Sequence, residues 1–349
     1  MTPDFATFLS AREQDRRDTF LGTARRLGTV EQNVEKDFWV CWTLAALFHA
    51  QSKDSPRLLF KGGTSLSKAF GLISRFSEDI DVTVFRNDLG QNVTVEELEA
   101  LSGQKRRNRL DAIKSACREY VMGDMQTLVR EQLRLVLREG GLPPESARVE
   151  PDPDDPDGQS LLVWYPTVTP TTGYVRPAVK IESGAKSALD PHEARIVRPY
   201  VADDLQQIDL TVPAITTVAA ERTFWDKVII LHGLRRWFER RGLLRGGGHR
   251  ISRHYYDVYQ LLESPIGKRA TADPALGADC VRHASMFFNS PDLDLATAKP
   301  GTFSLSPSDA MIADLARDYR AMTGMIFGNV PTFDQVIVSV ARLEHLVNS

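Results

Sequence analysis

The sequence predicts an α+β protein, with N-terminal helices, a mixed sheet core and an all-helical C-terminal part. Three observations predict it. In 30–50, apolar residues recur at the three- and four-residue spacing of a helix. Short runs rich in β-branched residues alternate with polar ones in 57–85. From Thr217 onward the apolar spacing is helical again. We therefore expect two domains, 1–212 and 213–349.

The composition is that of an ordinary globular chain, with 42% hydrophobic and 26% charged residues and a formal net charge of −3. A nucleic-acid partner would therefore need a local basic face. Three widely spaced cysteines without a CxxC pair favour a reducing cytoplasm over disulfides or zinc. We predict no signal peptide and, lacking a run of about 18 apolar residues, no membrane span.

The elements of the first half follow in order. A charged helix is expected over 4–27 and a second helix over 30–50. A short strand at 57–60 leads into a helix at 64–73, with Thr64 or Ser65 as its N-cap. A strand follows at 80–85, and basic helices occupy 95–140.

The Pro/Asp-rich stretch 142–159 is predicted to be a surface loop without regular structure. The strands 160–168 and 175–183 are expected to pair across a turn at Thr171–Gly173, with another strand at 194–201. Helices are expected at 218–238, 249–264 and 307–327.

Two carboxylates alternate on the strand that begins at residue 80. Side chains two apart on a strand share a face, so Asp79 and Asp81 project together and Ile80 points the other way. Adjacent carboxylates repel each other, and Mg²⁺, which also binds substrate phosphates, would resolve this. A DxD alone is more often a solvated pair.

Two glycines lie between the preceding strand and helix. Without a Cβ, Gly62 and Gly63 let backbone amides approach an anion, and Thr64 and Ser65 add hydroxyl donors. Lys61, just before them, completes the expected nucleotide-binding group. This is not a Walker A loop.

Together these features outline nucleotidyl transfer, in which one element holds a triphosphate and the next holds its metal. A third carboxylate usually positions or deprotonates the nucleophile. Strand alternation in "AVKIES" turns Lys180 and Glu182 to the site, so Glu182 is the candidate third metal ligand.

Several stretches give the chain a resemblance to a known family. They are "VEKDFWVCWTL" (34–44), "FKGGTSLSKAFGLISRFSEDIDV" (60–82), "VKIE" (179–182), "AAERTFWDKVIILH" (219–232), "RHYYDVYQLL" (253–262) and "DLARDYRAMTGMIF" (314–327). The chain resembles the polymerase-β-type nucleotidyltransferases and, more narrowly, the AbiEii/AbiGii and MenT-like toxins of toxin–antitoxin and abortive-infection phage-defence systems.

The resemblance implies a toxin that transfers nucleotides from an NTP to RNA, with the tRNA 3′ acceptor end as the substrate class, and so blocks translation. It also implies Mg²⁺ and an AbiEi-like antitoxin, with no commitment to a stable complex. Gly62, Gly63 and Thr64 would contact phosphates. Asp79 and Asp81 would bind metal.

Three further positions carry family roles. Ser77 matches a serine beside the first carboxylate that is phosphorylated in some relatives. Lys227 matches a lysine that holds the nucleotide, and Asp257 matches a functional aspartate. The plain alternatives are a surface lysine paired with Glu221 or Asp226, and a surface acid near Arg253.

Arginines are concentrated between 233 and 254, around a run of three glycines, and we expect them to bind RNA phosphates. They are Arg235, Arg236, Arg240, Arg241, Arg245 and Arg250. A solvated charged hairpin is the alternative. Arg75, before the acidic pair, is expected either to reach a phosphate or to balance Glu78.

Two other functions stay open on the sequence. The enzyme could transfer a nucleotide to a small molecule or a protein. The chain could also be a non-catalytic nucleic-acid-binding module that keeps the fold.

Overall fold

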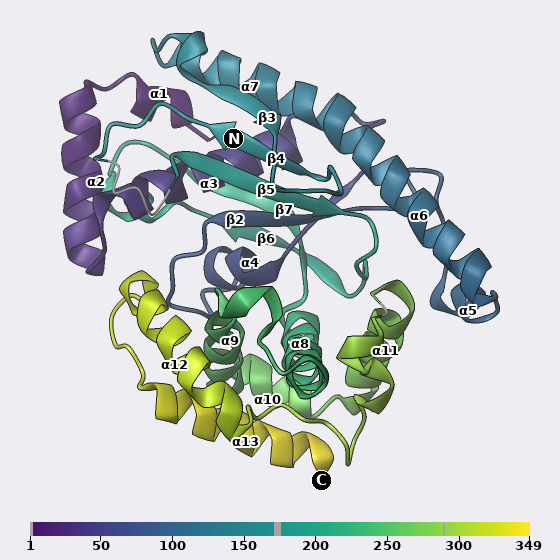
Figure 1. Cartoon of the computed structure of the whole chain (residues 1–349). Helices are drawn as coiled ribbons and strands as arrows, with labels where there is room; N and C mark the ends of the chain where they lie inside the picture. Colours follow the sequence, from purple (N-terminus) through teal and green to yellow (C-terminus); the bar gives the residue numbers. More distant parts are fainter. Residues whose placement is uncertain (1–2, 171–175, 289) are drawn as a thin grey trace. The chain divides into compact units, whose positions relative to one another are not determined.

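The computed structural model describes residues 3–170, 176–288 and 290–349 (Figure 1). These residues form two compact units that are discontinuous in sequence. The first, the sheet unit, comprises the described residues up to Phe70 together with Phe76–Val93 and Gly103–Val218. The second, the helical unit, comprises Gly71–Arg75, Thr94–Ser102 and Ala219–Ser349.

A seven-stranded mixed sheet forms the centre of the sheet unit, in the order β3-β4-β5-β2-β1-β7-β6. The strands are β1 (Leu58–Lys61), β2 (Asp79–Val84), β3 (Arg148–Pro151), β4 (Ser160–Trp164), β5 (Ala178–Gly184), β6 (His192–Val197) and β7 (Val212–Val218). β2 runs antiparallel to β1 and parallel to β5. The predicted mixed sheet is confirmed, and β2 lies in its interior, where flanking strands fix the direction of its side chains.

Six α-helices lie in the described residues of the sheet unit. They are α1 (Phe5–Leu9), α2 (Glu13–Leu27), α3 (Glu31–His49), α4 (Gly62–Lys68), α6 (Gly103–Tyr120) and α7 (Gln126–Glu139). A π-helical turn, Val121–Met125, joins the last two. α3 contacts β2, β5 and β7 and is buried along nearly its whole length, so it forms the central support behind the strands.

The helical unit contains seven helices in its described residues. They are α5 (Val95–Glu99), α8 (Ala220–Arg241), α9 (Ser252–Glu263), α10 (Pro265–Thr271), α11 (Pro274–Phe287), α12 (Asp309–Met322) and α13 (Phe333–Asn348). α8 contacts α9, α10 and α11, and α9 contacts α12 and α13. The predicted all-helical C-terminal part is confirmed.

Several predicted boundaries were wrong. A strand, β3, lies inside the Pro/Asp stretch, where Val149 is buried and Pro151 ends the pairing with β4. α4 is shorter than expected, since the chain leaves helical geometry after Ala69 and Gly71 has a φ of +62°. The turn expected at Thr171–Gly173 lies outside the described residues, although β4 and β5 do pair as predicted.

The predicted domain boundary at 212 coincides with the start of β7, a strand that the sequence analysis missed. The units divide after Val218 instead, and two short segments from the first half belong to the helical unit. The three cysteines are buried and free, as expected. Within the described part of the chain, no helix is long and apolar enough to cross a membrane.

Candidate active site

The diglycine turn and the second carboxylate of the pair meet in the sheet unit. β1 and β2 pair so that Lys61 lies opposite Asp81, which brings the turn beside the acid. A Cβ added to Gly62 would lie 2.0 Å from Asp81 Oδ2, and the φ of this glycine is +78°. Only glycine fits here without displacing the carboxylate. The Lys61 ammonium lies 3.9 Å from Asp81 Oδ1.

The acidic pair shares one face of β2, as strand alternation predicts. Ile80, between the two acids, is fully buried, whereas Asp79 and Asp81 are partly exposed. In the parallel pairing with β5, Asp79 lies opposite Lys180 and Asp81 opposite Glu182. Because directly opposed residues share a face, three acids and one lysine project to the same side of the sheet.

Glu182 is held by that lysine. Lys180 Nζ lies 2.8 Å from Glu182 Oε1 and 3.0 Å from Oδ2 of Asp152, a buried residue of the Pro/Asp stretch. Across the described residues, no group of three His, Cys, Asp or Glu side chains is placed to hold a metal ion. Glu182 as a third metal ligand therefore stays a prediction, and Asp79 and Asp81 are the two acids that the geometry of β2 places on one face.

The role of Lys180 was missed in the sequence analysis. The signal was present, because Lys180 stands two residues before Glu182 on the same strand face. Its buried partner Asp152 had no such signal, since it lies in a stretch that was predicted to be a solvated loop.

The hydroxyls beside the glycines are engaged within the sheet unit. Thr64 Oγ1 is within hydrogen-bond distance of two acceptors, Ser77 Oγ at 2.8 Å and the main-chain carbonyl of Asp79. Ser65 Oγ donates to the Gly62 carbonyl at 2.8 Å. Both side chains are buried, and neither caps α4, which starts at Gly62. The predicted N-cap was wrong: the Thr64 hydroxyl connects the turn to the start of β2, and the Ser65 hydroxyl bonds within the turn.

Lys227 and Asp257 form a buried ionic cluster inside the helical unit. Asp257 is 0% exposed. It accepts two hydrogen bonds from Arg75, at 2.8 and 2.9 Å, and Lys227 Nζ lies 2.9 Å from its Oδ2. The surface alternatives for both residues were wrong, because both are buried. The expected contact of Arg75 with a phosphate or with Glu78 stays a prediction beside its observed contact with Asp257. Glu78 is bound by Lys36 at 2.7 Å.

The charges of this cluster compensate each other. Burial raises the pKa of Asp257, but the positive charges of Arg75 and Lys227 outweigh that effect and leave this pKa below its ordinary value. Burial lowers the pKa of Lys227, and Asp257 opposes the shift. His254 Nδ1 lies 3.3 Å from Lys227 Nζ, and burial with the nearby positive charges lowers the pKa of His254 well below its ordinary value. The imidazole is therefore neutral and can accept a hydrogen bond from the lysine.

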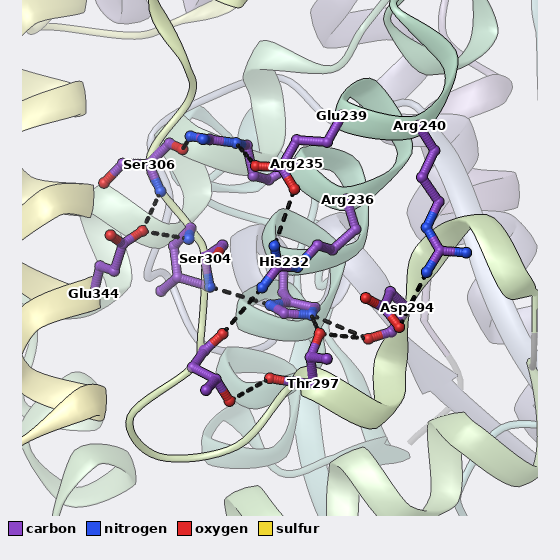
Figure 2. Close-up of polar contacts among 12 residues, drawn as sticks. His232, Arg235, Arg236, Glu239, Arg240, Asp294, Thr297, Ser304, Ser306 and Glu344 are labelled. Carbon is purple, nitrogen blue, oxygen red and sulfur yellow. Dashed lines mark hydrogen bonds and ion pairs between the residues drawn. The ribbon is translucent and has the colours of Figure 1, made fainter.

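Most of the arginines expected to bind RNA have partners within the helical unit (Figure 2). Arg235 and Arg236 both pair with Glu239, at 2.7 and 3.0 Å. Arg235 also donates to the Ser306 carbonyl, and Arg240 lies 3.3 Å from Asp294. The contacts to Ser306 and Asp294 connect α8 to the chain between α11 and α12, whereas the two pairs with Glu239 lie within α8.

The other three expected RNA contacts differ among themselves. Arg241 pairs with Asp292 at 2.5 Å. The guanidinium of Arg245 lies 5.6 Å from the centre of the Trp237 ring. The main-chain N–H of Arg250 donates to Asp318, and the φ of Arg250 is +59°. RNA binding by these three arginines stays a prediction.

Comparison with known proteins places the chain. The family model described as nucleotidyl transferase AbiEii toxin, type IV TA system, matches residues 45–339. No curated protein matches the chain. Among solved structures, the nucleotidyltransferase toxin MenT4 from Mycobacterium tuberculosis is similar to 95% of this chain over 97% of its own, at 16% identity and a TM-score of 0.45.

The family model covers most of the chain. The matched range includes Gly62, Gly63, Asp79, Asp81, Glu182, Lys227 and Asp257. The chain therefore belongs to the AbiEii nucleotidyltransferase toxin family of type IV toxin–antitoxin systems.

Proposed function

We propose that this nucleotidyltransferase uses Mg²⁺ to transfer nucleotides from an NTP to RNA, with the tRNA 3′ acceptor end as its target, and thereby blocks translation. The observation that carries the proposal is the contact between Gly62 and Asp81. It joins a backbone suited to polyphosphate with a carboxylate suited to the accompanying metal. Because α4 has only seven residues, close backbone approach contributes more here than a helix dipole.

Asp79 and Asp81 are the residues that would hold the metal. Two carboxylates on one strand face leave the remaining positions of a Mg²⁺ ion to substrate phosphates and water, which is the usual protein site for this ion. When bound, the ion neutralises the triphosphate and stabilises developing charge on its oxygens.

The transfer is an in-line displacement at the α-phosphorus. The oxygen of the RNA 3′-hydroxyl forms the new bond, the bond to the bridging oxygen breaks, and pyrophosphate leaves with its electron pair. Glu182, held by Lys180, orients that hydroxyl and accepts its proton. The family resemblance assigns the triphosphate to Lys227, whose ammonium Asp257 holds in place.

A direct assay separates the acceptors. The protein is incubated with each labelled NTP and purified tRNA, total RNA or total protein, and the products are resolved on gels. We expect label at the 3′ end of tRNA, none with Asp81→Asn, and inhibition of cell-free translation by the wild type alone. Label on protein or on a small molecule would overturn the RNA assignment and leave the nucleotidyltransferase intact.

The cognate antitoxin is a partner that the family implies. We propose an AbiEi-like protein encoded nearby. Co-expression with that protein is expected to relieve growth inhibition, and co-purification distinguishes a stable complex from indirect neutralisation.

A further inference from the structure

Three consecutive charged residues of α3 are buried in the sheet unit. Glu35, Lys36 and Asp37 are 1%, 3% and 1% exposed. Burying a charge is costly unless the group is paired and hydrogen-bonded, so each of the three needs a partner. Each has at least one, and the partners lie on segments that are separate from α3 in sequence. Neither the family description nor the proposed chemistry assigns these residues a role.

Asp37 connects α3 to α4. Its Oδ1 lies 2.7 Å from the ammonium of Lys68, the last residue of α4. Its Oδ2 accepts a hydrogen bond at 2.6 Å from the main-chain N–H of Tyr200. Lys68 Nζ lies 3.5 Å from the centre of the Tyr200 ring. The helix that begins with the diglycine turn is therefore fixed at its far end.

Lys36 connects α3 to the chain that enters β2. Its Nζ lies 2.7 Å from Glu78 Oε2 and 3.4 Å from the Arg176 carbonyl. Glu78 is the residue between Ser77 and Asp79, in irregular backbone just before the strand begins. The lysine therefore holds the residue next to the first carboxylate.

Thr64 completes a closed set of contacts by joining α4 to Ser77 and Asp79. We call Lys36, Asp37, Thr64, Lys68 and Glu78 the α3 cluster. Through it, the diglycine turn and the acidic pair are each tied to α3 and to each other. No single contact connects all three segments, because α3, α4 and the start of β2 are separate in sequence.

We propose that Lys36 and Asp37 are positioning residues that hold the diglycine turn at a fixed distance from Asp79 and Asp81. The inference rests on the proposed function, in which an NTP and its metal bind at these two elements. Displacing a reacting group by about 1 Å costs on the order of 10²-fold in rate, so a cluster that fixes this distance has a measurable effect.

The test separates positioning from stability with two variants. In Lys36→Met, the half-buried Glu78 carboxylate loses its lysine, and the melting temperature falls. In the double variant Lys36→Met/Glu78→Gln, the charge that lost its lysine is also removed, and the melting temperature recovers. The tie to α3 is absent in both.

Affinity for NTP with Mg²⁺ is measured by titration calorimetry below the melting temperature of each variant, and kcat and KM in the transfer assay. We expect both variants to bind NTP at least about tenfold more weakly and to share a lowered kcat, since misplaced groups weaken binding and rate together. Recovery of affinity along with melting temperature in the double variant would overturn the inference, as would wild-type affinity in both.

Glu35→Gln is the matched control. Glu35 is buried on the same helix but accepts hydrogen bonds from the main chain of Val168 and the hydroxyls of Thr167 and Thr169, outside the α3 cluster. It should lower the melting temperature with unchanged NTP affinity. If the wild type binds no NTP, the proposed function fails and the inference with it; if it binds and the Lys36 variants match it, only the inference fails.

Discussion

At the residue scale, the site depends on an approach so close that only glycine, which has no side chain, permits it. Gly62 shows this best, because its α-carbon lies against the Asp81 carboxylate. The sequence was sufficient to predict that meeting, since a diglycine after one strand and alternating acids on the next are local patterns. It was not sufficient for the two hydroxyls: that of Thr64 bonds to Ser77 and Asp79, and that of Ser65 bonds to the nearby Gly62 carbonyl.

Gly62→Ala should abolish transfer. The added Cβ would force Asp81 aside, and the left-handed backbone would add about 1–2 kcal/mol of strain. Gly90→Ala is the control, since Gly90 also has a positive φ, +67°, but nothing lies within 4 Å of its added Cβ. It should lose similar stability and keep its activity. Equal activity in the two variants, measured by labelled-NTP transfer, would contradict the assigned contact.

Asp257→Asn should be strongly destabilising. It would leave Arg75 and Lys227 buried without their counter-charge, and breaking a buried pair in this way costs about 3–5 kcal/mol. Urea unfolding measures the loss. Glu221 lies on the same helix as Lys227 and forms an exposed pair with Arg269. Removing that pair in Glu221→Gln should cost less than about 1 kcal/mol. Similar losses in both would contradict the buried cluster.

The pairing of Arg75 with Asp257 was out of reach of sequence reasoning for a physical reason. The two residues are 182 positions apart, and each has a nearer, plausible partner of opposite charge. Local spacing favours those neighbours, Glu78 and Arg253. The folded chain buries Arg75 against Asp257, and local spacing carries no signal of that burial.

At the scale of the elements, the long helices were predictable, whereas two strands, β3 and β7, were not. The helices predicted from apolar spacing at 30–50 and 218–238 are present as α3 and α8, with boundaries shifted by a few residues. β7 was not predicted because Pro213 weakens the strand pattern of the sequence. In the structure, the φ of the next residue, Ala214, is +55°, so the strand is irregular there. Its place in the sheet comes from pairing with β1 and β6.

The segment between α11 and α12 is held to α8 by a buried histidine (Figure 2). His232 Nδ1 accepts a hydrogen bond from the Ser304 main chain at 3.1 Å, and its Nε2 lies 3.1 Å from Thr297 Oγ1. The proton is therefore on Nε2, and protonation of Nδ1 would break the contact to Ser304. Burial lowers the pKa of His232 below 6.5.

Acidification should therefore destabilise the helical unit. Below the unfolded-state pKa of 6.5 the unfolded chain binds a proton that the folded chain excludes, so this stability is present above pH 6.5 and is lost as pH falls through it. The slope is at most about 1.4 kcal/mol per pH unit. Melting temperatures between about pH 7 and about pH 5 should fall more steeply for the wild type than for His232→Gln. Parallel curves would exclude the histidine as the cause.

At the scale of the whole molecule, neither unit is a continuous stretch of chain. Gly71–Arg75 and Thr94–Ser102 belong to the helical unit although they lie between elements of the sheet unit. Ser74 accepts a main-chain hydrogen bond from Phe327, and Arg282 of α11 pairs with Glu96 and Glu99 of α5. Composition changes along the chain predicted a single boundary, because they do not show that two short segments of the first half pack into the helical unit.

A cut at the apparent domain boundary should therefore damage both pieces. Residues 1–218 would keep Arg75 without Asp257, and residues 219–349 would keep Asp257 with Lys227 alone as its counter-charge. We expect neither piece alone to unfold cooperatively in urea, whereas the two co-expressed pieces should purify together and recover a cooperative transition, because the lost contacts are re-formed between chains. A cooperative transition in 219–349 by itself would show that Gly71–Arg75 and Thr94–Ser102 are dispensable, and the helical unit would then be an independent domain.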